Sequence, residues 1–200
     1  MDVVDAVAGG RGHPLPEARL RVGPAPGSLQ PVTPNASGDR ARAALAGTRF
    51  HDVRWLDETG STNADLLELA RHGEPEGIVE VADHQTAGRG RHGRSWEAPP
   101  GASLMCSVLL RPPSAVAGAT TMTVAVAAAD AVRSTTGVEL GLKWPNDLVW
   151  PGDGSGRDRK LAGILAEADW PAGSTVASGW ASPGASEPVV VVVGVGLNVA

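Results

Sequence analysis

The residues with the clearest chemical capability form a basic segment rich in glycine. This segment is Gly88-Arg89-Gly90-Arg91-His92-Gly93-Arg94-Ser95-Trp96. Glycine lets the backbone approach a ligand closely, and loop N–H groups beside guanidinium groups form a receptacle for phosphate or carboxylate. The closing tryptophan offers a flat face to a base or another planar group. The segment predicts an anionic-ligand site, with a solvated loop or a nucleic-acid-binding arginine–glycine segment as alternatives.

Two polar segments stand at the predicted ends of a helix and a strand. Ser61, Thr62 and Asn63 begin a helix, where unpaired N–H groups and hydroxyls can bind a small polar head group. The alternative is plain capping, with Thr62 and Asp65 at capping-box spacing. The turn Lys143-Trp144-Pro145-Asn146-Asp147 gathers an ammonium, an amide and a carboxylate that could hold a nucleotide and its metal. A turn closed by an Asx hydrogen bond would have the same residues.

Two glycine-containing strands complete the set of chemically unusual segments. Lys160 enters an apolar strand and Gly163 follows, a pattern that can place an ammonium group in a pocket approached by backbone. A solvated strand end is the alternative. The segment Gly194-Val195-Gly196-Leu197-Asn198 ends a valine-rich strand with an amide that could contact a purine edge or close a simple turn. It lacks the third glycine and following helix of a dinucleotide-binding fingerprint.

Strands and two helices must position these segments. Apolar runs predict strands at 53–56, 78–82, 102–110, 140–144, 148–150, 160–168 and 188–195. The predicted helices begin near 59–63 and 119, and end near Gly73 and Gly137. The succession of helix, strands, helix and further strands indicates an α+β domain around a mixed sheet. The five valines at 189–193 predict a strand buried on both faces.

Three segments lie outside these predicted elements. Residues 1–46 contain six prolines, five arginines and four acidic residues without an apolar period, which predicts a disordered tail. This tail has no helix-turn-helix pattern. Residues 152–156 have hairpin-turn chemistry, and residues 171–188 are predicted to form an exposed loop. Residues 47–200 are therefore expected to form the folded domain.

Composition restricts the class of protein. The 200 residues are 42% hydrophobic with a formal net charge of −5, which allows one domain with a core and argues against general nucleic-acid coating. The single cysteine, Cys106, excludes an internal disulfide framework, suits a reducing cytoplasm, and is predicted to pack in an apolar strand. The first residues do not form a signal peptide. The apolar window 115–131 predicts a buried helix rather than a membrane span.

Taken in order, these segments resemble the biotin protein ligases, which attach biotin to carboxylase carrier proteins. The resemblance spans about residues 51–199 and depends most on the basic glycine loop, the Lys-Trp-Pro-Asn-Asp turn and the Lys-Leu-Ala-Gly-Ile-Leu strand. It implies an α+β catalytic domain with a mixed, mainly antiparallel sheet flanked by helices. It also implies that biotin and ATP form biotinyl-5′-adenylate, and that biotin then passes to a specific lysine of a biotin carboxyl carrier protein, as in acetyl-CoA carboxylase.

The resemblance also assigns roles to individual residues. The expected catalytic residues are Lys160, Arg91 and Arg89. The expected biotin-binding residues are Ser61, Thr62, Asn63, Gln85, Gly88, Arg89, Arg91, Lys160 and Gly163. The expected ATP- or adenylate-binding residues are Arg91, Arg94, Trp96, Asn146, Asp147, Lys143 and Asn198. Mg²⁺ is expected to accompany ATP, and its protein ligands stay unassigned.

The chain departs from the family pattern at both ends. Some family members carry an N-terminal winged helix where this chain has its proline-rich residues 1–46, so we expect an enzyme without specific DNA binding. The single cysteine and the lack of a predicted membrane span lead us to expect a cytoplasmic enzyme without membrane contact. A homodimer is compatible with the family. Members continue beyond Asn198 with further sheet, helix and a small C-terminal barrel, so residues 47–200 are expected to be an incomplete catalytic domain.

Two other classes of protein remain as alternatives. Lipoate ligases and octanoyl transferases resemble the same catalytic fold and also modify a carrier lysine. A nucleotide- or nucleic-acid-binding module would use the basic glycine loop but would leave the Ser-Thr-Asn segment and Lys160 without a role.

Overall fold

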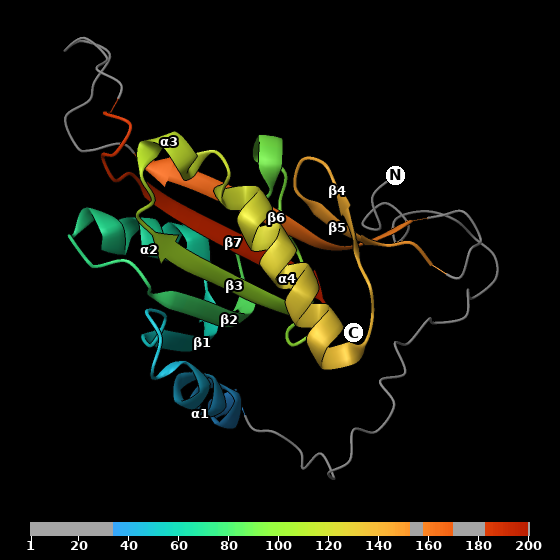
Figure 1. The fold of residues 1–200 in the computed structure, drawn as a ribbon. Helices are drawn as coiled ribbons and strands as arrows, with labels where there is room; N and C mark the ends of the chain where they lie inside the picture. The colour runs from blue at the N-terminus through green and yellow to red at the C-terminus, as the bar shows by residue number, and fades with distance from the viewer. Residues whose placement is uncertain (1–33, 153–157, 170–182, 200) are drawn as a thin grey trace.

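One sheet of seven strands organises the part of the chain described by a computed structural model, residues 34–152, 158–169 and 183–199. The strands are β1 (Val53–Thr59), β2 (Val79–Gln85), β3 (Ser103–Leu110), β4 (Gly141–Lys143), β5 (Asp147–Trp150), β6 (Arg159–Asp169) and β7 (Val190–Asn198). Their order across the sheet is β1-β2-β3-β7-β6-β5-β4 (Figure 1). Only β1 and β2 pair in parallel, and the other neighbours are antiparallel. The predicted mixed, mainly antiparallel sheet is confirmed.

Helices cover both faces of this sheet. The described α-helices are α1 (Pro34–Leu45), α2 (Thr62–Arg71), α3 (Ser114–Ala117) and α4 (Thr120–Thr136). Alternate residues of β7 separate the two faces, because Val191 and Val193 join the α4 cluster while Val192 joins the α2 cluster. All three valines are at most 2% exposed, which confirms a strand buried on both faces. In Figure 1, α4 crosses the front of the sheet and α2 lies behind it.

Helix α1 contradicts the prediction of a disordered tail over residues 1–46, at least for residues 34–45. The helix docks on the outer strand: Gly38 is close to the Cβ of Trp55, and the Nε of Arg42 donates to the carbonyl of Val53 at 3.0 Å. Ala41 and Leu45 pack against the β1–β2 cluster. The helix is stabilised by this docking, which a composition averaged over many prolines conceals. Residues 1–33 lie outside the described residues.

Glycines end the two longer predicted helices as expected. Gly73 and Gly137 have φ values of +86° and +75°, in the left-handed region that glycine adopts without strain. The helix predicted at 115–131 forms, as α3 and α4, but it is only partly buried: α4 buries Thr120 and Ala125 and leaves Val126 47% exposed. No helix in the described part of the chain is long and apolar enough to cross a membrane.

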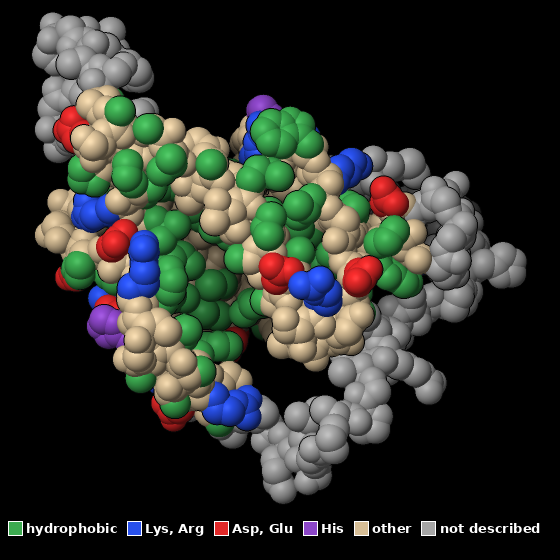
Figure 2. Space-filling model, in the orientation of Figure 1, with side chains coloured by type: hydrophobic (Ala, Val, Ile, Leu, Met, Phe, Trp, Pro, Cys, Tyr) green, Lys and Arg blue, Asp and Glu red, His purple; other side chains and the backbone are tan. Residues whose placement is uncertain are grey.

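The face that carries α1 and α4 is not fully covered. Figure 2 shows apolar side chains gathered in a hollow between these helices, over the middle of the sheet. Leu104, on β3, is 37% exposed. The opposite face holds α2 and, beside its first turn, the cavity described below. The predicted turn at 152–156 and loop at 171–188 fall largely outside the described residues.

Candidate active site

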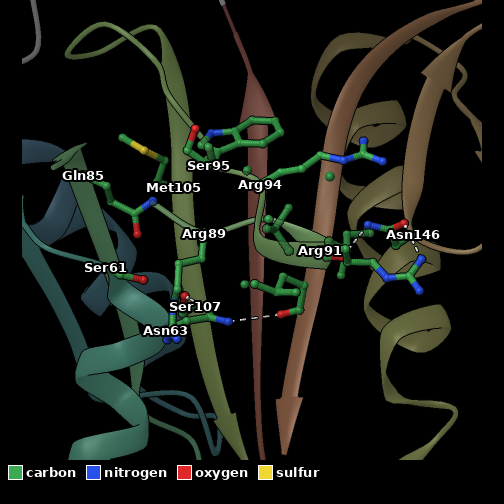
Figure 3. A pocket seen from close by; sticks show the side chains of 18 of the residues that line it. Ser61, Asn63, Gln85, Arg89, Arg91, Arg94, Ser95, Met105, Ser107 and Asn146 are labelled. Atoms are coloured by element: carbon green, nitrogen blue, oxygen red, sulfur yellow. Dashed lines mark hydrogen bonds between the residues drawn. The ribbon is translucent and has the colours of Figure 1, made fainter. Parts of the chain in front are cut away.

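A cavity of about 310 Å³ lies on the α2 face of the sheet. The first turn of α2, the end of β2, the basic loop and strands β3, β5, β6 and β7 all contribute to its wall. Thirteen predicted site residues line it: Ser61, Thr62, Asn63, Gln85, Arg89, Arg91, Arg94, Trp96, Asn146, Asp147, Lys160, Gly163 and Asn198. Five segments far apart in the sequence therefore meet at one site, and Figure 3 shows their side chains converging.

Two predicted residues do not line this cavity. Gly88 lines a neighbouring cavity that the basic loop also borders, and a Cβ atom on Gly88 would collide with the carbonyl oxygen of Trp96. Its glycine identity is therefore required by close packing of the loop on itself. Lys143 is exposed at the end of β4, the edge strand beyond the cavity wall.

The first turn of α2 forms a polar end of the cavity. Gln85 replaces the expected cap: its Oε1 accepts from the backbone N–H of Thr62 at 2.8 Å. The predicted capping box is wrong, because Ser61 is the N-cap and makes no capping bond, while Asp65 instead accepts from the hydroxyl of Thr59. The reason is a tertiary contact, because the side chain of Gln85 on β2 accepts the hydrogen bond at the N-terminus of α2 that a capping residue would otherwise accept. Ser61 is left with its hydroxyl at the cavity wall.

A buried hydrogen-bond chain supports this polar end. The hydroxyls of Thr62 and Ser107 lie 2.6 Å apart, and Ser107 donates to the Oδ1 of Asn63 at 2.6 Å. The amide of Asn63 donates to the carbonyl of Leu165 at 3.2 Å and to Glu167 at 2.8 Å. Asn63 thus has protein partners on both ends of its amide, and it joins α2 to β6. Its contact with a ligand stays a prediction.

The indole of Trp96 packs over two glycines of the sheet. A Cβ atom on Gly196 would lie 2.5 Å from Cε2 of Trp96, and one on Gly163 would lie 3.2 Å from Cζ3. The Nζ of Lys160 is 5.9 Å from the centroid of the same ring. The indole N–H is buried and has no hydrogen-bond partner among the described residues. Trp96 therefore forms part of the cavity wall and holds the basic loop close to the sheet.

The loop itself is a compact turn. The N–H of Gly90 donates to the carbonyl of Arg94 at 2.7 Å, and Arg89 and Ser95 form an isolated β-bridge. His92 has a φ of 58°, an uncommon conformation for a residue with a Cβ. The N–H of Trp96 donates to the carbonyl of Gly88 at 2.9 Å and closes the turn.

Three cationic side chains that line the cavity each form an ion pair or a hydrogen bond with a residue from another segment. The Nζ of Lys160 lies 3.0 Å from the Oδ1 of Asp147. A guanidinium N–H of Arg91 donates to the Oδ1 of Asn146 at 3.2 Å, as Figure 3 shows. Arg89 pairs with Glu167 on β6 at 3.1 Å.

Two amides hold the cavity rim to the sheet. The Nδ2 of Asn146 donates to the carbonyl of Ile164 at 3.0 Å, which fixes the turn that precedes β5. The Oδ1 of Asn198 accepts from the hydroxyl of Ser103 at 2.8 Å, which fixes the end of β7.

Sequence analysis missed several residues of the site. Met105 and Ser107 line the cavity from β3, and Glu167 contacts both Asn63 and Arg89. The period-two alternation of β3 could have placed the side chains of Met105 and Ser107 on one face of the sheet, while Cys106 between them also borders the cavity. Burial raises the pKa of the Cys106 thiol to about 12, which agrees with a packing role.

Comparison with known proteins identifies the family. Residues 55–176 match the model of the biotin/lipoate A/B protein ligase family, and the chain belongs to that family. It is 40% identical over 176 residues to the biotin–[acetyl-CoA-carboxylase] ligase of Mycobacterium tuberculosis, covering 84% of this chain and 56% of the relative. It is 38% identical over 120 residues to the bifunctional ligase/repressor BirA of Bacillus subtilis, covering 59% of this chain and 34% of that one.

The fold is shared with a solved member of the same group. The biotin protein ligase of Leishmania major in complex with biotin superposes with a TM-score of 0.53 at 23% identity, over 74% of this chain and 56% of that chain. The present chain thus spans a little over half the length of the Mycobacterium tuberculosis and Leishmania major relatives.

Proposed function

We propose that the chain carries the catalytic site of a biotin protein ligase, which activates biotin with ATP and transfers it to a lysine of a biotin carboxyl carrier protein. The supporting observation is one cavity with a polar end at α2 and a cationic end at the basic loop. Biotin has the matching sequence of groups: a ureido ring, an apolar chain and a carboxylate. We assign residues 47–200 to this catalytic unit, with α1 packed against it.

The polar end is assigned to the ureido ring. Thr62 and Gln85 are joined by hydrogen bonds, and Ser61 lines the cavity next to Thr62. Together they offer hydroxyl and amide groups to a ring that both donates and accepts. Asn63 and Ser107 hold that cluster in place through buried bonds of 2.6 Å. A scaffold fixed in this way binds without first having to order its own side chains.

The cationic end is assigned to the reacting groups. An oxygen of the biotin carboxylate attacks the α-phosphorus of ATP, the bond to the β-phosphate oxygen breaks, and pyrophosphate leaves. Because both reactants are anions, the site must offset their repulsion and stabilise the charge that develops on the phosphate. Lys160, Arg89 and Arg91 are the cations assigned to this task, and all three line the cavity.

The nucleotide is assigned to the part of the cavity near Trp96. The amides of Asn146 and Asn198 are assigned to an adenine edge, and Arg94 and the indole line the same cavity. Gly163 contributes by letting the backbone of β6 approach closely, since its Cβ position already meets Trp96. Lys143 is assigned a supporting role at the rim.

Mg²⁺ is expected to arrive with the phosphates of ATP. Asp147 fits such an ion, because its carboxylate lines the cavity beside the cations of the site and its buried Oδ1 lies 3.0 Å from the ammonium of Lys160. Mg²⁺ is commonly held by one or two carboxylates together with substrate phosphates. Its contribution would be to neutralise phosphate charge, while Asp147 also orients Lys160 at 3.0 Å.

The second step transfers biotin to the carrier. The unprotonated amine of the acceptor lysine attacks the acyl carbon of the adenylate, an amide bond forms, and AMP leaves as the amine loses a proton. The protein must keep the adenylate in place until the carrier arrives. The loop 88–96, which packs over the sheet through Trp96, is assigned this role.

The polar end of the cavity also favours biotin over lipoate and octanoate. A dithiolane ring or an alkyl terminus would leave Ser61, Thr62 and Gln85 without ligand partners in a largely buried place. Sites built to hydrogen-bond a ligand group discriminate strongly against analogues that lack it.

The experiment that tests the proposal is exchange of labelled pyrophosphate into ATP in the presence of Mg²⁺. Biotin, lipoate and octanoate are tested in parallel. Exchange with biotin alone is expected. Exchange with lipoate or octanoate instead would transfer the assignment to those ligases.

If no pyrophosphate exchange is observed with any of the three acids, a binding measurement is needed. Calorimetric titration with biotin would then show whether the cavity holds the acid at all. Absence of biotin binding would refute the proposed function of this chain.

A further inference from the structure

Glu80 is a buried carboxyl group that the proposed reaction does not use. Glu80 is 4% exposed and lies on β2 opposite Ser107 of β3. Its Oε1 has no hydrogen-bond partner within the described residues. An isolated ionised carboxylate is costly to bury unless it is paired or protonated. The surroundings of Glu80 must therefore favour its protonated form.

The hydrogen-bond partner of Glu80 is another carboxyl group, that of Asp65 in the first turn of α2. The two side chains form a hydrogen bond, which requires a proton on one of them, since ionised carboxylates only accept. Asp65 also accepts from the hydroxyl of Thr59. Burial, followed by the bond and charge of Asp65, raises the pKa of Glu80 to about 7. This carboxyl pair therefore holds one proton in mildly acidic solution and loses it as the pH passes neutrality.

Other charged groups near the pair are already engaged. Arg54 stands opposite on β1, and its charge opposes the pKa rise, but its guanidinium donates to Asp52 at 2.9 Å. His84 and Glu58, further along β2 and β1, lie 2.9 Å apart and pair with each other. The neighbouring strand β3 presents the neutral hydroxyl of Ser107.

The carboxyl pair lies next to the polar end of the cavity. Ser107, opposite Glu80, contacts Thr62 and Asn63 at 2.6 Å each. Those two residues share the first helical turn of α2 with Asp65. A shift of this turn away from β2 would therefore displace the groups assigned to the ureido ring.

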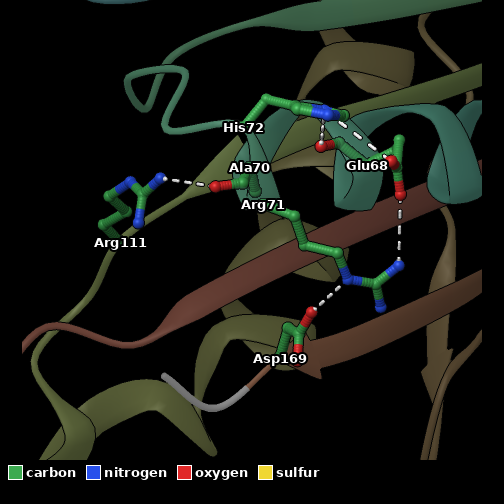
Figure 4. A network of polar contacts seen from close by, with 6 residues as sticks. All are labelled: Glu68, Ala70, Arg71, His72, Arg111 and Asp169. Carbon is green, nitrogen blue, oxygen red and sulfur yellow. Dashed lines mark hydrogen bonds and ion pairs between the residues drawn. The ribbon is translucent and has the colours of Figure 1, made fainter. Parts of the chain in front are cut away.

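The other end of α2 is held to its neighbours by arginines, while the exposed His72 contacts its own helix, with its Nδ1 3.0 Å from the carbonyl oxygen of Glu68. Arg71 donates to Asp169 at 2.7 Å, and Arg111 donates to the carbonyl of Ala70 at 3.4 Å (Figure 4). Arg111 also donates to the carbonyl of Glu74 at 2.8 Å. Arginine stays charged at every relevant pH. The two ends of the helix are thus expected to respond differently to pH.

We propose that Glu80 is a positioning residue for the head-group end of the cavity, which holds the first turn of α2 against β2 by sharing one proton with Asp65. When that proton is lost, two adjacent negative charges repel each other and the turn loosens. Ligand binding at this end then weakens as pH rises, and binding is accompanied by proton uptake. That the ligand is biotin rests on the proposed function.

The test measures the turn and the ligand separately. Hydrogen exchange of the amides at 62–66 is followed at pH 6 and pH 8.5 without ligand, corrected for the intrinsic pH dependence of exchange. Biotin affinity is measured by calorimetry at the same pH values. Three proteins are compared: wild type, Glu80→Gln, and Glu58→Gln, which removes an exposed carboxylate from the same pair of strands.

Wild type and Glu58→Gln are expected to lose protection at 62–66 at pH 8.5. They are also expected to bind biotin roughly tenfold more weakly at this pH, which corresponds to a difference of one unit between the pKa of the carboxyl pair in the free and in the biotin-bound protein. Glu80→Gln is expected to show neither change, since an amide can donate to Asp65 at every pH. Asp65→Asn supplies a second variant, whose amide can donate to an ionised Glu80 and should remove the same pH dependence.

Equal pH dependence in wild type and Glu80→Gln would overturn the proposal, as would a wild-type turn that is insensitive to pH. If the exchange results follow expectation but biotin binds at neither pH, the proposed function fails and the positioning role of Glu80 stands. Should Glu80→Gln fail to fold, the wild-type exchange and the Asp65→Asn variant decide the question.

Discussion

Trp96 of the basic loop packs directly against Gly196 of β7. A Cβ atom on this glycine would lie 2.5 Å from Cε2 of the indole, well inside carbon–carbon contact distance. The absence of a side chain on β7 is thus what lets the loop approach the sheet. The loop carries the arginines of the site, so a single glycine on a strand controls where those arginines lie.

Replacing Gly196 by alanine should displace Trp96 and the loop with it. We expect at least a tenfold fall in biotin-dependent pyrophosphate exchange, because even a small misplacement of reacting groups is costly. Gly118→Ala is the matched control, since its Cβ would meet nothing within 4 Å. Equal activity of the two variants would show that the indole position is unimportant.

Lys160→Ala should abolish most adenylation while the fold persists. The substitution removes the cation that faces the reacting anions and leaves Asp147 without its partner at 3.0 Å. Loss of one preorganised electrostatic group typically costs about 10²- to 10³-fold in rate. Pyrophosphate exchange measures the loss, and Arg133→Ala, on the exposed side of α4, is the control. Turnover close to wild type would remove Lys160 from the mechanism.

Arg91→Ala should weaken binding of ATP and the adenylate. A charge-assisted hydrogen bond contributes about 1.5–3 kcal/mol, which corresponds to roughly 10- to 150-fold in affinity. The variant also loses the 3.2 Å bond to Asn146 and with it one tie between the loop and β5. Calorimetric titration with ATP in the presence of biotin gives the affinity. Unchanged affinity would assign Arg91 to the solvent side of the loop.

Glu167→Gln should loosen the basic loop. It removes the charge that pairs with Arg89 at 3.1 Å but keeps an oxygen for the amide of Asn63. Partly exposed ion pairs contribute about 0.2–1 kcal/mol, so we expect a two- to fivefold loss of biotin affinity and faster proteolysis at Arg89–Arg94. Asp169→Asn, at the far end of β6, is the control. Proteolysis that is equally slow in both variants would argue against the pairing.

The free energy of unfolding should fall as pH rises from 5 to 8. Glu80 binds its proton more tightly in the folded chain, with a pKa of about 7 against an ordinary value of 4.5. Its contribution is therefore complete below pH 4.5 and is lost as pH passes 7. We expect the free energy of unfolding of the wild type to fall by about 2–3 kcal/mol more than that of Glu80→Gln between pH 5 and pH 8. Urea denaturation measures it, and parallel curves for the two proteins would contradict the assignment.

The elements of the domain follow from local patterns in the sequence. Apolar runs predict every strand of the sheet to within a few residues, and Gly73 and Gly137 end helices where predicted, because these signals depend on neighbours along the chain. The helix at 34–45 was missed, because its stability comes from docking on β1 rather than from its own residues.

The residue types at the site could also be predicted from the sequence, because arginines, glycines and hydroxyl groups close together favour binding of an anionic ligand in any fold. What these residues contact was decided only by tertiary structure. Gln85 accepts a hydrogen bond from the first turn of α2, Glu167 pairs with Arg89, and Glu80 forms a hydrogen bond with Asp65. The partners in each pair are far apart in the sequence. Such partners are set by strand order and register, which depend on the packing of the whole sheet and are not encoded in any local pattern.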